Sequence, residues 1–426
     1  MLGWLNMDML KAYKYELRPS VEQMSLFDKH FGVNRYVYNW ALAKKIEYYT
    51  QTNKTLSQYE LMKQLTIHKN EKEWIGEVTA QSLQQTIIHL ETAYTAFFKK
   101  NVAFPKFKKK RTARKSYTVP QGIIVDFEKF EIQLPKMKHI KFNIDRKFIG
   151  IIKQATVSKT STHRYFISIL VENGDVLPEK KTPTIESTLG IDLGIKDFAI
   201  TSDGEVFQNP RLLKSSQKRL AVYQRRFSRS LKGSKNREEA RLKVARLNEK
   251  IANQRKDFQH KISTSLTRND SQVSIIAMEN LNVEGMLKNH KLAKHIQDVA
   301  WNQFTSFIKY KCDWYGKNFV QIGRFEPSSK TCSVCGHYHK ELTLKVREWK
   351  CPICGTVHDR DHNASRNIKN FGFVTFEKLG VEDAAPRINK AQLNGSATAE
   401  SVDVGKLLKK TFKGSRVNNT KLQTIA

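Results

Sequence analysis

The stretch GIDLGIKDFAITSDG, residues 190–204, decides the fold of this chain. Asp192 is the one acid of the apolar run 188–193, and it lies between Gly190 and Gly194. A second apolar run, 198–201, follows, and then a turn at Asp203-Gly204. Apolar runs of this length, bounded by glycine and polar turn residues, predict β-strands joined as a hairpin. We therefore expect an α/β domain around Asp192, in which this strand opens into the hairpin.

Two more acids stand at the edges of apolar elements. Glu279 ends the run Val273 to Met278 (VSIIAM), which predicts a second strand with the acid at its terminus. Asp361 begins the sequence DHNASRN, where it would cap a helix. Hydrolysis of a phosphodiester by two metal ions needs several carboxylates that converge on Mg²⁺. Asp192, Glu279 and Asp361 are therefore the candidate catalytic acids and magnesium ligands, although each alone could be a turn former, a surface acid or a helix cap.

Four cysteines form two CxxC pairs near Asp361. Cys332 and Cys335 are separated by fifteen residues from Cys351 and Cys354. This spacing is that of a four-thiolate zinc site, in which the closed tetrahedron makes the metal structural. Two disulfides or a redox CxxC pair are the alternatives. The fifth cysteine, Cys312, lies in a helical stretch, and we expect it to be buried.

The chain carries a large excess of positive charge. Its 426 residues include 74 Lys and Arg against 41 Asp and Glu, so the formal net charge is +33. A polyanion neutralises such a charge and gains the entropy of released counterions. Because the basic residues are spread along the chain instead of forming one juxtamembrane run, nucleic acid is a better partner than an anionic membrane.

The sequence also limits the compartment. No segment approaches the ~20 apolar residues of a membrane span, so we expect no membrane partner. The first ten residues lack the basic region and cleavage site of a secretory signal. Five cysteines in a chain of this length do not suggest a disulfide framework. We therefore expect a cytosolic or nucleoid-associated protein.

Two basic segments are candidates for nucleic-acid contact. Residues 104–115 (FPKFKKKRTARK) interleave Phe with Lys and Arg, which suits a phosphate backbone, with Lys106 and Lys108 as candidates. A solvated loop is the alternative. Residues 213–266 are basic and helical, are broken at Gly233-Ser234, and carry an apolar stripe that predicts a helical hairpin. The arginine-rich faces of this hairpin are either solvated surface or a cover for the substrate.

The motifs together resemble those of the TnpB family, the RNA-guided nucleases encoded by bacterial insertion sequences and regarded as related to the ancestors of type V CRISPR effectors. The resemblance runs over most of the chain. Its clearest parts are KYELRPSVEQ (14–23), FGVNRYVYNWAL (31–42), FPKFKKK (104–110), GIDLGIKDFAITSDG (190–204), AMENLNV (277–283), PSSKTCSVCG (327–336) and WKCPICGTVHDRDHNASRNI (349–368).

The resemblance implies a multidomain α/β architecture. The N-terminal part would be a β-barrel wedge domain with a helical recognition insertion. The remainder would be an RNase H-like (RuvC) nuclease domain, holding the helical hairpin and interrupted by a zinc ribbon. The implied boundaries are 9–20 and 103–180 for the wedge domain, 21–102 for the insertion, 185–325 and 357–376 for the nuclease domain, 213–266 for the hairpin, and 326–356 for the ribbon.

The resemblance also implies an RNA-guided DNA endonuclease with structural zinc and catalytic magnesium. Such a protein carries a guide RNA from the transposon end, binds target double-stranded DNA beside a short motif, and cuts where the guide pairs. By motif, the catalytic acids are again Asp192 in GIDLG, Glu279 in AMENL and Asp361 in DRDHNAS. Whether one copy or two hold the RNA is left open.

Residues that would touch the nucleic acid are harder to name. Amide and hydroxyl groups can read base edges, so Gln81, Gln85, Tyr117 and Thr118 are candidates for reading the target-adjacent motif. Arg360 or Arg366 is a candidate for contact with the scissile phosphate, with a surface charge as the alternative for each.

Three alternative functions stay open. A compact type V CRISPR effector would share every motif. A transposase that joins DNA strands without RNA is a second enzyme, and a catalytically silent RNA-guided DNA-binding repressor is a non-enzyme. The intact acids disfavour the repressor. We expect residues 380–426 to be disordered, and residues 1–8 to be an extension without function, because the usual start of the family fits Met9.

Overall fold

The computed structural model of the protein describes residues 8–99, 102–268, 272–343 and 346–383. Within them, one compact unit contains residues 8–28 and 114–381, and a second unit contains residues 29–113. The segment 1–7 and most of the tail 380–426 lie outside the described residues, so the expectations for the extension and the tail stay predictions. No helix of the described part is long and apolar enough to cross a membrane.

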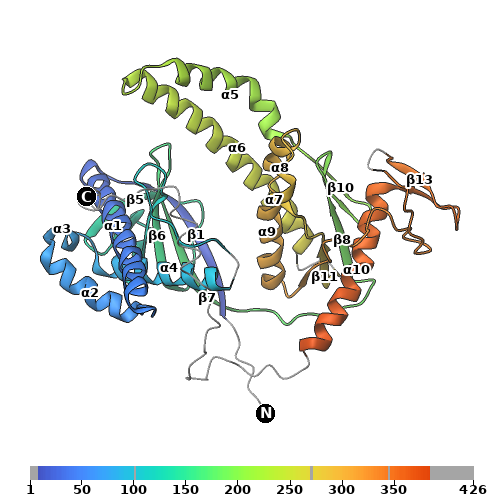
Figure 1. The fold of residues 1–426 in the computed structure, drawn as a ribbon, viewed down its shortest axis with the longest axis horizontal. Helices are drawn as coiled ribbons and strands as arrows, with labels where there is room; N and C mark the ends of the chain where they lie inside the picture. The colour runs from blue at the N-terminus through green and yellow to red at the C-terminus, as the bar shows by residue number, and fades with distance from the viewer. Residues whose placement is uncertain (1–7, 100–101, 269–271, 344–345, 384–426) are drawn as a thin grey trace, which may run out of the picture. The chain divides into compact units, whose positions relative to one another are not determined.

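The first unit contains a seven-stranded antiparallel sheet in the order β2-β6-β7-β1-β5-β4-β3 (Figure 1). Alternate residues of β7 are buried, as expected for a sheet with one face on a core. The strands are β1 (Asp8–Arg18), β2 (Lys115–Val119), β3 (Ile124–Asp126), β4 (Glu131–Leu134), β5 (Met137–Asn143), β6 (Ile151–Lys159) and β7 (Tyr165–Val176).

The closed barrel implied for this region is not found among the described residues. The edge strands β2 and β3 stand at opposite ends of the strand order and do not pair with each other. Alternating hydrophobicity predicts that a segment is a strand, but closure depends on pairing between the first and last strands, which local pattern does not encode.

The same unit contains a five-stranded mixed sheet in the order β10-β9-β8-β11-β12. The central strand β8 pairs antiparallel with β9 and parallel with β11, and β11 pairs parallel with β12. The strands are β8 (Thr188–Leu193), β9 (Asp197–Thr201), β10 (Val206–Gln208), β11 (Ile275–Met278) and β12 (Asn318–Gln321). The strands predicted around Asp192 and before Glu279 are therefore confirmed.

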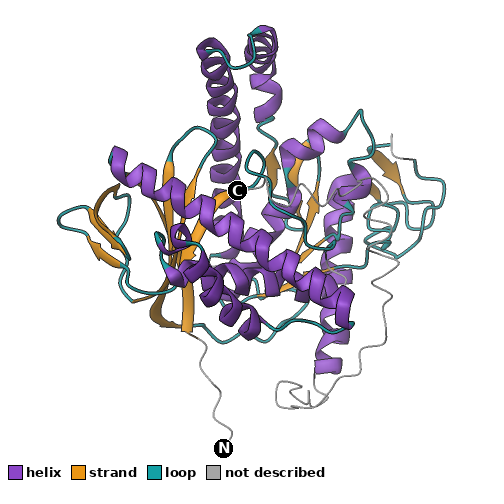
Figure 2. Ribbon diagram, turned by 60° about the vertical axis from the view of Figure 1, so that its left-hand side comes forward, coloured by secondary structure: helices purple, strands orange, loops and turns teal. Residues whose placement is uncertain are grey.

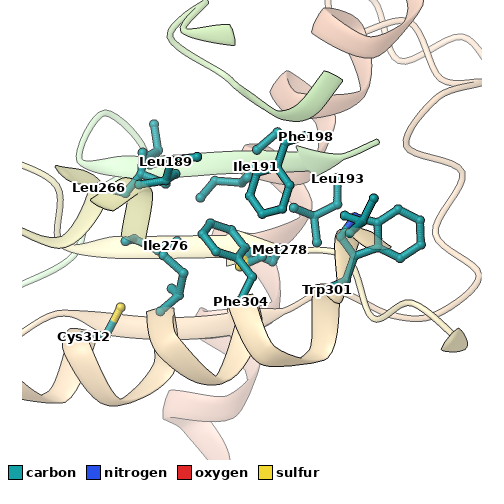
Figure 3. Packing of buried hydrophobic residues seen from close by; sticks show 14 of the residues in the cluster. Leu189, Ile191, Leu193, Phe198, Leu266, Ile276, Met278, Trp301, Phe304 and Cys312 are labelled. Carbon is teal, nitrogen blue, oxygen red and sulfur yellow. The ribbon is translucent and has the colours of Figure 1, made fainter. Parts of the chain in front are cut away.

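Helices cover this sheet on both faces. One face packs on a core to which α6 and α9 contribute Leu266 and Phe304, as Figure 3 shows. The other face receives α10. A Cβ on Gly190 of β8 would lie 2.1 Å from the carbonyl oxygen of Ser365 in α10, so glycine permits this close approach. The helices are α5 (Leu212–Arg229), α6 (Lys235–Thr267), α7 (Val283–Met286), α8 (Ala293–Val299), α9 (Trp301–Trp314) and α10 (Arg360–Asp383).

The predicted helical hairpin is confirmed as α5 and α6, which lie side by side in Figure 2. The break falls where it was expected. Gly233 has a φ of 88°, and the Ser234 side chain accepts a hydrogen bond from the amide of Arg237 as the N-cap of α6. Leu247, Ile251 and Ile262 of the predicted stripe are buried.

The second unit is helical. Leu83, Ile87 and Leu90 of α4 are buried in its core with residues of α1 and α2. Ser57 and Glu60 form a capping box that starts α2. The helices are α1 (Val21–Thr52), whose first turns belong to the first unit, α2 (Gln58–Glu71), α3 (Glu73–Gly76) and α4 (Ala80–Phe98).

Candidate active site and zinc centre

Asp192 is placed by the alternation of strand β8. Its neighbours Ile191 and Leu193 point into the core shared with α9. Because successive side chains of a strand point to opposite faces, Asp192 shares the other face with Gly190. That face receives α10 at Ser365, and Asp361 lies one helical turn before Ser365. The strand therefore directs Asp192 towards the start of α10.

Glu279 is placed by the parallel pairing of β11 with β8. The register aligns Met278 with Ile191, so the next residue on each strand is Glu279 beside Asp192. Ser328 donates a hydrogen bond of 2.6 Å from its hydroxyl to Oε1 of Glu279. The neighbouring chain thus holds one carboxylate oxygen of Glu279 and fixes the orientation of the group.

The negative charges of Glu279 and Asp361 act on Asp192, so the three acids lie near one another. The pKa of Asp192 is raised well above its usual range by burial and by the negative charges of Glu279 and Asp361, while the nearby Arg360 opposes the rise. Burial also raises the pKa of Glu279, against the hydrogen bond from Ser328. Carboxylates crowded in this way favour a divalent cation, and oxygen ligands are those that Mg²⁺ prefers. The three carboxylates supply the type of ligand that magnesium needs, and their roles as magnesium ligands and catalytic acids stay a prediction.

The start of α10 differs in detail from the sequence expectation. Asp359 Oδ1 accepts hydrogen bonds from the amides of Asp361 and His362, so Asp359 is the N-cap and Asp361 is not. A cap residue precedes the helix and accepts from its second and third amides, which places Asp361 inside the first turn. The Asp361 carboxylate is thereby left for other partners. The guanidinium of Arg347 donates to both of its oxygens, each at 3.2 Å.

The four predicted zinc ligands converge. The Sγ atoms of Cys332, Cys335, Cys351 and Cys354 all lie within 4.8 Å of one another. Cys332 and Cys354 are 3.6 Å apart, as are Cys335 and Cys351. Zn–S bonds of ~2.3 Å in a tetrahedron require Sγ separations of about 3.8 Å, so the cluster fits a zinc ion. His358 Nε2 lies 3.0 Å from Sγ of Cys332, where it can donate to a thiolate without being a ligand.

Polar contacts join the cysteine segment to α10. Asn363 accepts from the amide of Ser333 and donates to the carbonyl of Thr331, and Asn367 donates to the same carbonyl. Arg360 is 7% exposed and donates to the carbonyl of Thr343 and to Oγ of Ser329. The predicted contact of Arg360 with a phosphate therefore competes with a buried structural role, which sequence could not reveal.

Two other predicted contact residues are buried in the first unit. Tyr117 and Thr118 lie in β2, and Thr118 Oγ1 is 3.0 Å from Thr156 Oγ1 on the neighbouring strand. Neither offers an exposed surface to a base. Tyr and Thr occur both in buried strands and at positions that contact bases. The sequence pattern therefore could not distinguish a structural role from a base contact.

The remaining candidates lie in the second unit. Gln81 and Gln85 are half-buried on α4. Lys106 is exposed, whereas the main chain of Lys108 is hydrogen-bonded in both directions to Asn39, and its ammonium lies 3.6 Å from the ring centroid of Tyr38. Lys106 is thus the more available of the two lysines for a phosphate.

Sequence reasoning missed Arg347 and Ser328. Both lie in segments next to the cysteines. Each contacts an acid that is distant in the sequence, Ser328 with Glu279 and Arg347 with Asp361. Arg347 lies between the two CxxC pairs and belongs to no motif that would have identified it as a functional residue. Ser328 belongs to the PSSKTC motif, which was noted only for the cysteine that follows.

Three family models match parts of the chain. The model described as "Probable transposase" matches residues 168–290, which include Asp192 and Glu279. The model described as "Cas12f1-like, TNB domain" matches residues 301–368, which include the cysteine cluster and Asp361. The model described as "Helix-turn-helix domain" matches residues 7–54.

Two similar proteins match most of the chain, and a third matches about half of it. A protein of Streptomyces pristinaespiralis named as an RNA-guided DNA endonuclease is 38% identical over 369 residues, covering 85% of this chain and 90% of that protein. InsQ of Escherichia coli K12, named likewise, is 33% identical over 381 residues, covering 85% and 92%. CRISPR-associated endodeoxyribonuclease Cas12f1 of Sulfoacidibacillus thermotolerans is 23% identical over 209 residues, covering 46% and 48%.

A solved structure shares the fold. Cas12f1, determined by electron cryomicroscopy in complex with a single guide RNA and target DNA, superposes with a TM-score of 0.54 at 15% identity. The superposition covers 82% of this chain and 83% of that one.

Proposed function

Since the chain belongs to the TnpB-like family of RNA-guided DNA endonucleases, we propose that Asp192, Glu279 and Asp361 are the catalytic acids with which it hydrolyses target DNA. The observation that carries the proposal is their convergence from three separate elements. Asp192 is in the central strand β8, Glu279 follows β11, and Asp361 is in the first turn of α10. The mutual charge effect on the pKa of Asp192 supports a common cation site.

We further propose that the five-stranded sheet is the core of an RNase H-like (RuvC) nuclease domain. The order β10-β9-β8-β11-β12, with an antiparallel meander first and parallel strands after it, supports this assignment. The cysteine segment would be the zinc ribbon of this domain. The seven-stranded sheet and the helical unit would be the wedge and recognition parts, with the boundaries that the sequence implied.

The chemistry follows from the residues. Mg²⁺ bound by the three carboxylates would stabilise the attacking and leaving oxygens of an in-line displacement at phosphorus. Ser328 fixes Glu279 through its 2.6 Å hydrogen bond, and Asp359 fixes the first turn of α10, so both acids are oriented before a substrate arrives. Arg347 forms an ion pair with Asp361. Once a cation replaces Arg347 at this carboxylate, the guanidinium would be able to donate to a phosphate oxygen.

The proposed partners are a guide RNA and target double-stranded DNA. The net charge of +33 calls for a polyanion, and the likeness in fold to Cas12f1 supports a protein that holds a heteroduplex. In such effectors the protein binds the backbone and reads a short adjacent motif, while base pairing reads the rest of the sequence. Zinc would act by holding the ribbon, and so Asp361, in place.

A second candidate is a transposase that joins DNA strands without RNA. The description "Probable transposase" of the model over residues 168–290 favours it, and a carboxylate site of this kind suits strand transfer as well as hydrolysis. An assay with transposon-end DNA and no RNA separates the two functions, because only the transposase would form joined products.

The decisive experiment uses the full chain purified with its bound RNA. Sequencing that RNA gives the guide, and a supercoiled plasmid carrying the matching target is then incubated with and without Mg²⁺. We expect Mg²⁺-dependent cutting by the wild type, none by Asp192→Ala, and wild-type cutting by Asp203→Ala, a matched control at an exposed acid of the hairpin turn. Equal RNA content in all three proteins shows that binding is retained. Undiminished cutting by Asp192→Ala would overturn the assignment.

A further inference from the structure

A pocket opens beside Glu279 on the side of the first unit where β8 and β11 end. It has a volume of ≈ 280 Å³ and is lined by Leu193 of β8, by the segment from Glu279 to Leu281, by Gln321 of β12 and by the first turns of α9. Glu279 belongs both to the acid cluster and to this pocket. A group bound in the pocket would therefore touch the candidate active site directly.

The lining is polar but nearly uncharged. Asn280, Asn302 and Gln321 contribute amide side chains, and Thr305 and Ser306 contribute hydroxyls. Among the described residues that line the pocket there is no Lys or Arg, and the only charge is the carboxylate of Glu279. Such a lining does not suit a phosphate, whereas amides and hydroxyls suit the neutral donors and acceptors on a base edge.

One wall is formed by the indole of Trp301, a residue that is only 3% exposed and lines the pocket. Figure 3 shows the Trp301 ring next to Leu193 at the end of the core cluster, so these two side chains give the pocket an apolar wall. The planar face of a base can pack against such a wall while amides and hydroxyls contact its edge.

We infer that this pocket binds an unpaired nucleobase of the DNA strand that is cut, next to the phosphate held at the three acids. The inference rests on the proposed function and deepens it. The volume lies just below the ~300 Å³ at which drug-sized pockets begin, so it suits one base and excludes a duplex. The base must be unpaired because a pocket of this volume cannot also hold its pairing partner.

The pocket also couples base binding to the catalytic geometry. Gln321 Nε2 lies 3.5 Å from the main-chain oxygen of Glu279, and Glu279 Oε1 is held by Ser328 from the other side. A base bound against Asn302 and Trp301 fixes the position of its own sugar, and hence of the phosphate beside it. The pocket thereby selects which phosphodiester of the strand lies at the acids.

The test is an abasic scan of the cut strand. Guide-matched targets are made with a single abasic site at each position around the cut, and cleavage rates are measured for the wild type, Asn302→Ala and Gln303→Ala. Gln303 is an exposed amide on the same turn of α9 that does not line the pocket, so it is a matched control. We expect one abasic position to slow the wild type about tenfold, the effect of one or two lost hydrogen bonds.

Asn302→Ala should cut the intact target about tenfold more slowly and lose its sensitivity at that one position, whereas Gln303→Ala should behave as wild type. Thr305→Val, which retains the volume, and Trp301→Phe, which keeps an aromatic wall with a smaller ring, are measured alongside, with melting temperatures to show that they fold. If folded pocket variants match Gln303→Ala at every position, the pocket inference fails alone. If the wild type with its RNA does not cut, the proposed function fails and the inference falls with it.

Discussion

Arg347 donates to both carboxylate oxygens of Asp361, each at 3.2 Å, so one guanidinium links the cysteine-bearing segment to the last of the three acids. The main chain of Arg347 is fixed as well, because its carbonyl accepts the amide of Arg360 at 2.7 Å. The pair is partly exposed, which limits its strength. The position of Arg347 matters more, because it is hydrogen-bonded to the same carboxylate oxygens of Asp361 that a bound cation would use.

Arg347 should therefore compete with magnesium. In Arg347→Ala the Mg²⁺ concentration for half-maximal cleavage should fall by roughly two- to fivefold, the effect of losing an exposed ion pair of about 0.5–1 kcal/mol. The maximal rate should fall too, because the phosphate loses a donor. Titration of the cleavage rate with Mg²⁺ checks both effects. Arg347→Lys is the control, and its Mg²⁺ concentration for half-maximal cleavage should stay close to that of the wild type. If Arg347→Ala needs more Mg²⁺ than the wild type, Arg347 does not compete with magnesium.

The close packing of β8 against α10 gives a second prediction. A Cβ at residue 190 would lie 2.1 Å from the carbonyl of Ser365 and 2.4 Å from the amide of Lys369, both main-chain atoms. Gly190→Ala should push α10 and Asp361 away, cost roughly 1–3 kcal/mol of stability, and greatly reduce cleavage. The control is Gly32→Ala in α1, because a Cβ at residue 32 meets no atom within 4 Å. This substitution should stabilise the protein by about 0.5–1 kcal/mol, since alanine favours the helix over glycine. Chemical denaturation and cleavage assays compare the two, and equal behaviour would refute the packing argument.

Zinc should affect catalysis by holding α10, and with it Asp361, in position. Cys351→Ser should remove the zinc and slow cleavage, measured at saturating Mg²⁺, by at least about tenfold, as loss of a supporting shell does in other metal sites. The reason is that Arg347, Asn363 and Asn367 connect the cysteine segment to α10. Elemental analysis should give one zinc per chain in the wild type. Cys312→Ala, at a buried cysteine outside the cluster, should keep that zinc; a zinc-free protein with full activity would contradict the prediction.

The sequence predicted those parts of the site that local pattern encodes. Asp192 and Glu279 were identifiable because each stands in or at the end of an apolar run, and the cysteines because zinc fixes their spacing. What it could not predict depends on contacts between distant segments. The open seven-stranded sheet and the pairing of Arg347 with Asp361 are of this kind. The cap at Asp359 was missed because two acids lie two residues apart and either could start the helix.

A buried lysine should make stability depend on pH. Lys311 of α9 is 5% exposed, and its ammonium donates to the carbonyl of His260 and to the hydroxyls of Ser263 and Thr264 in α6. Burial lowers the pKa of Lys311 to about 8. The unfolded value is ~10.4, so between these values the folded protein loses the proton first. Stability from this group therefore rises with pH in that window and is lowest below pH 8, where both states are charged.

Lys311→Met removes the titration, so the melting temperature of the variant minus that of the wild type should decrease as pH rises from about 7.5 to 10. Burial holds the pKa of the neighbouring His260 at about 4, so His260 stays neutral and adds no slope in this range. Lys309→Met, at an exposed lysine on the same helix, should show a constant offset over the same pH series. A constant offset for Lys311→Met as well would mean that Lys311 keeps its proton throughout, and that its three hydrogen bonds outweigh the cost of burial.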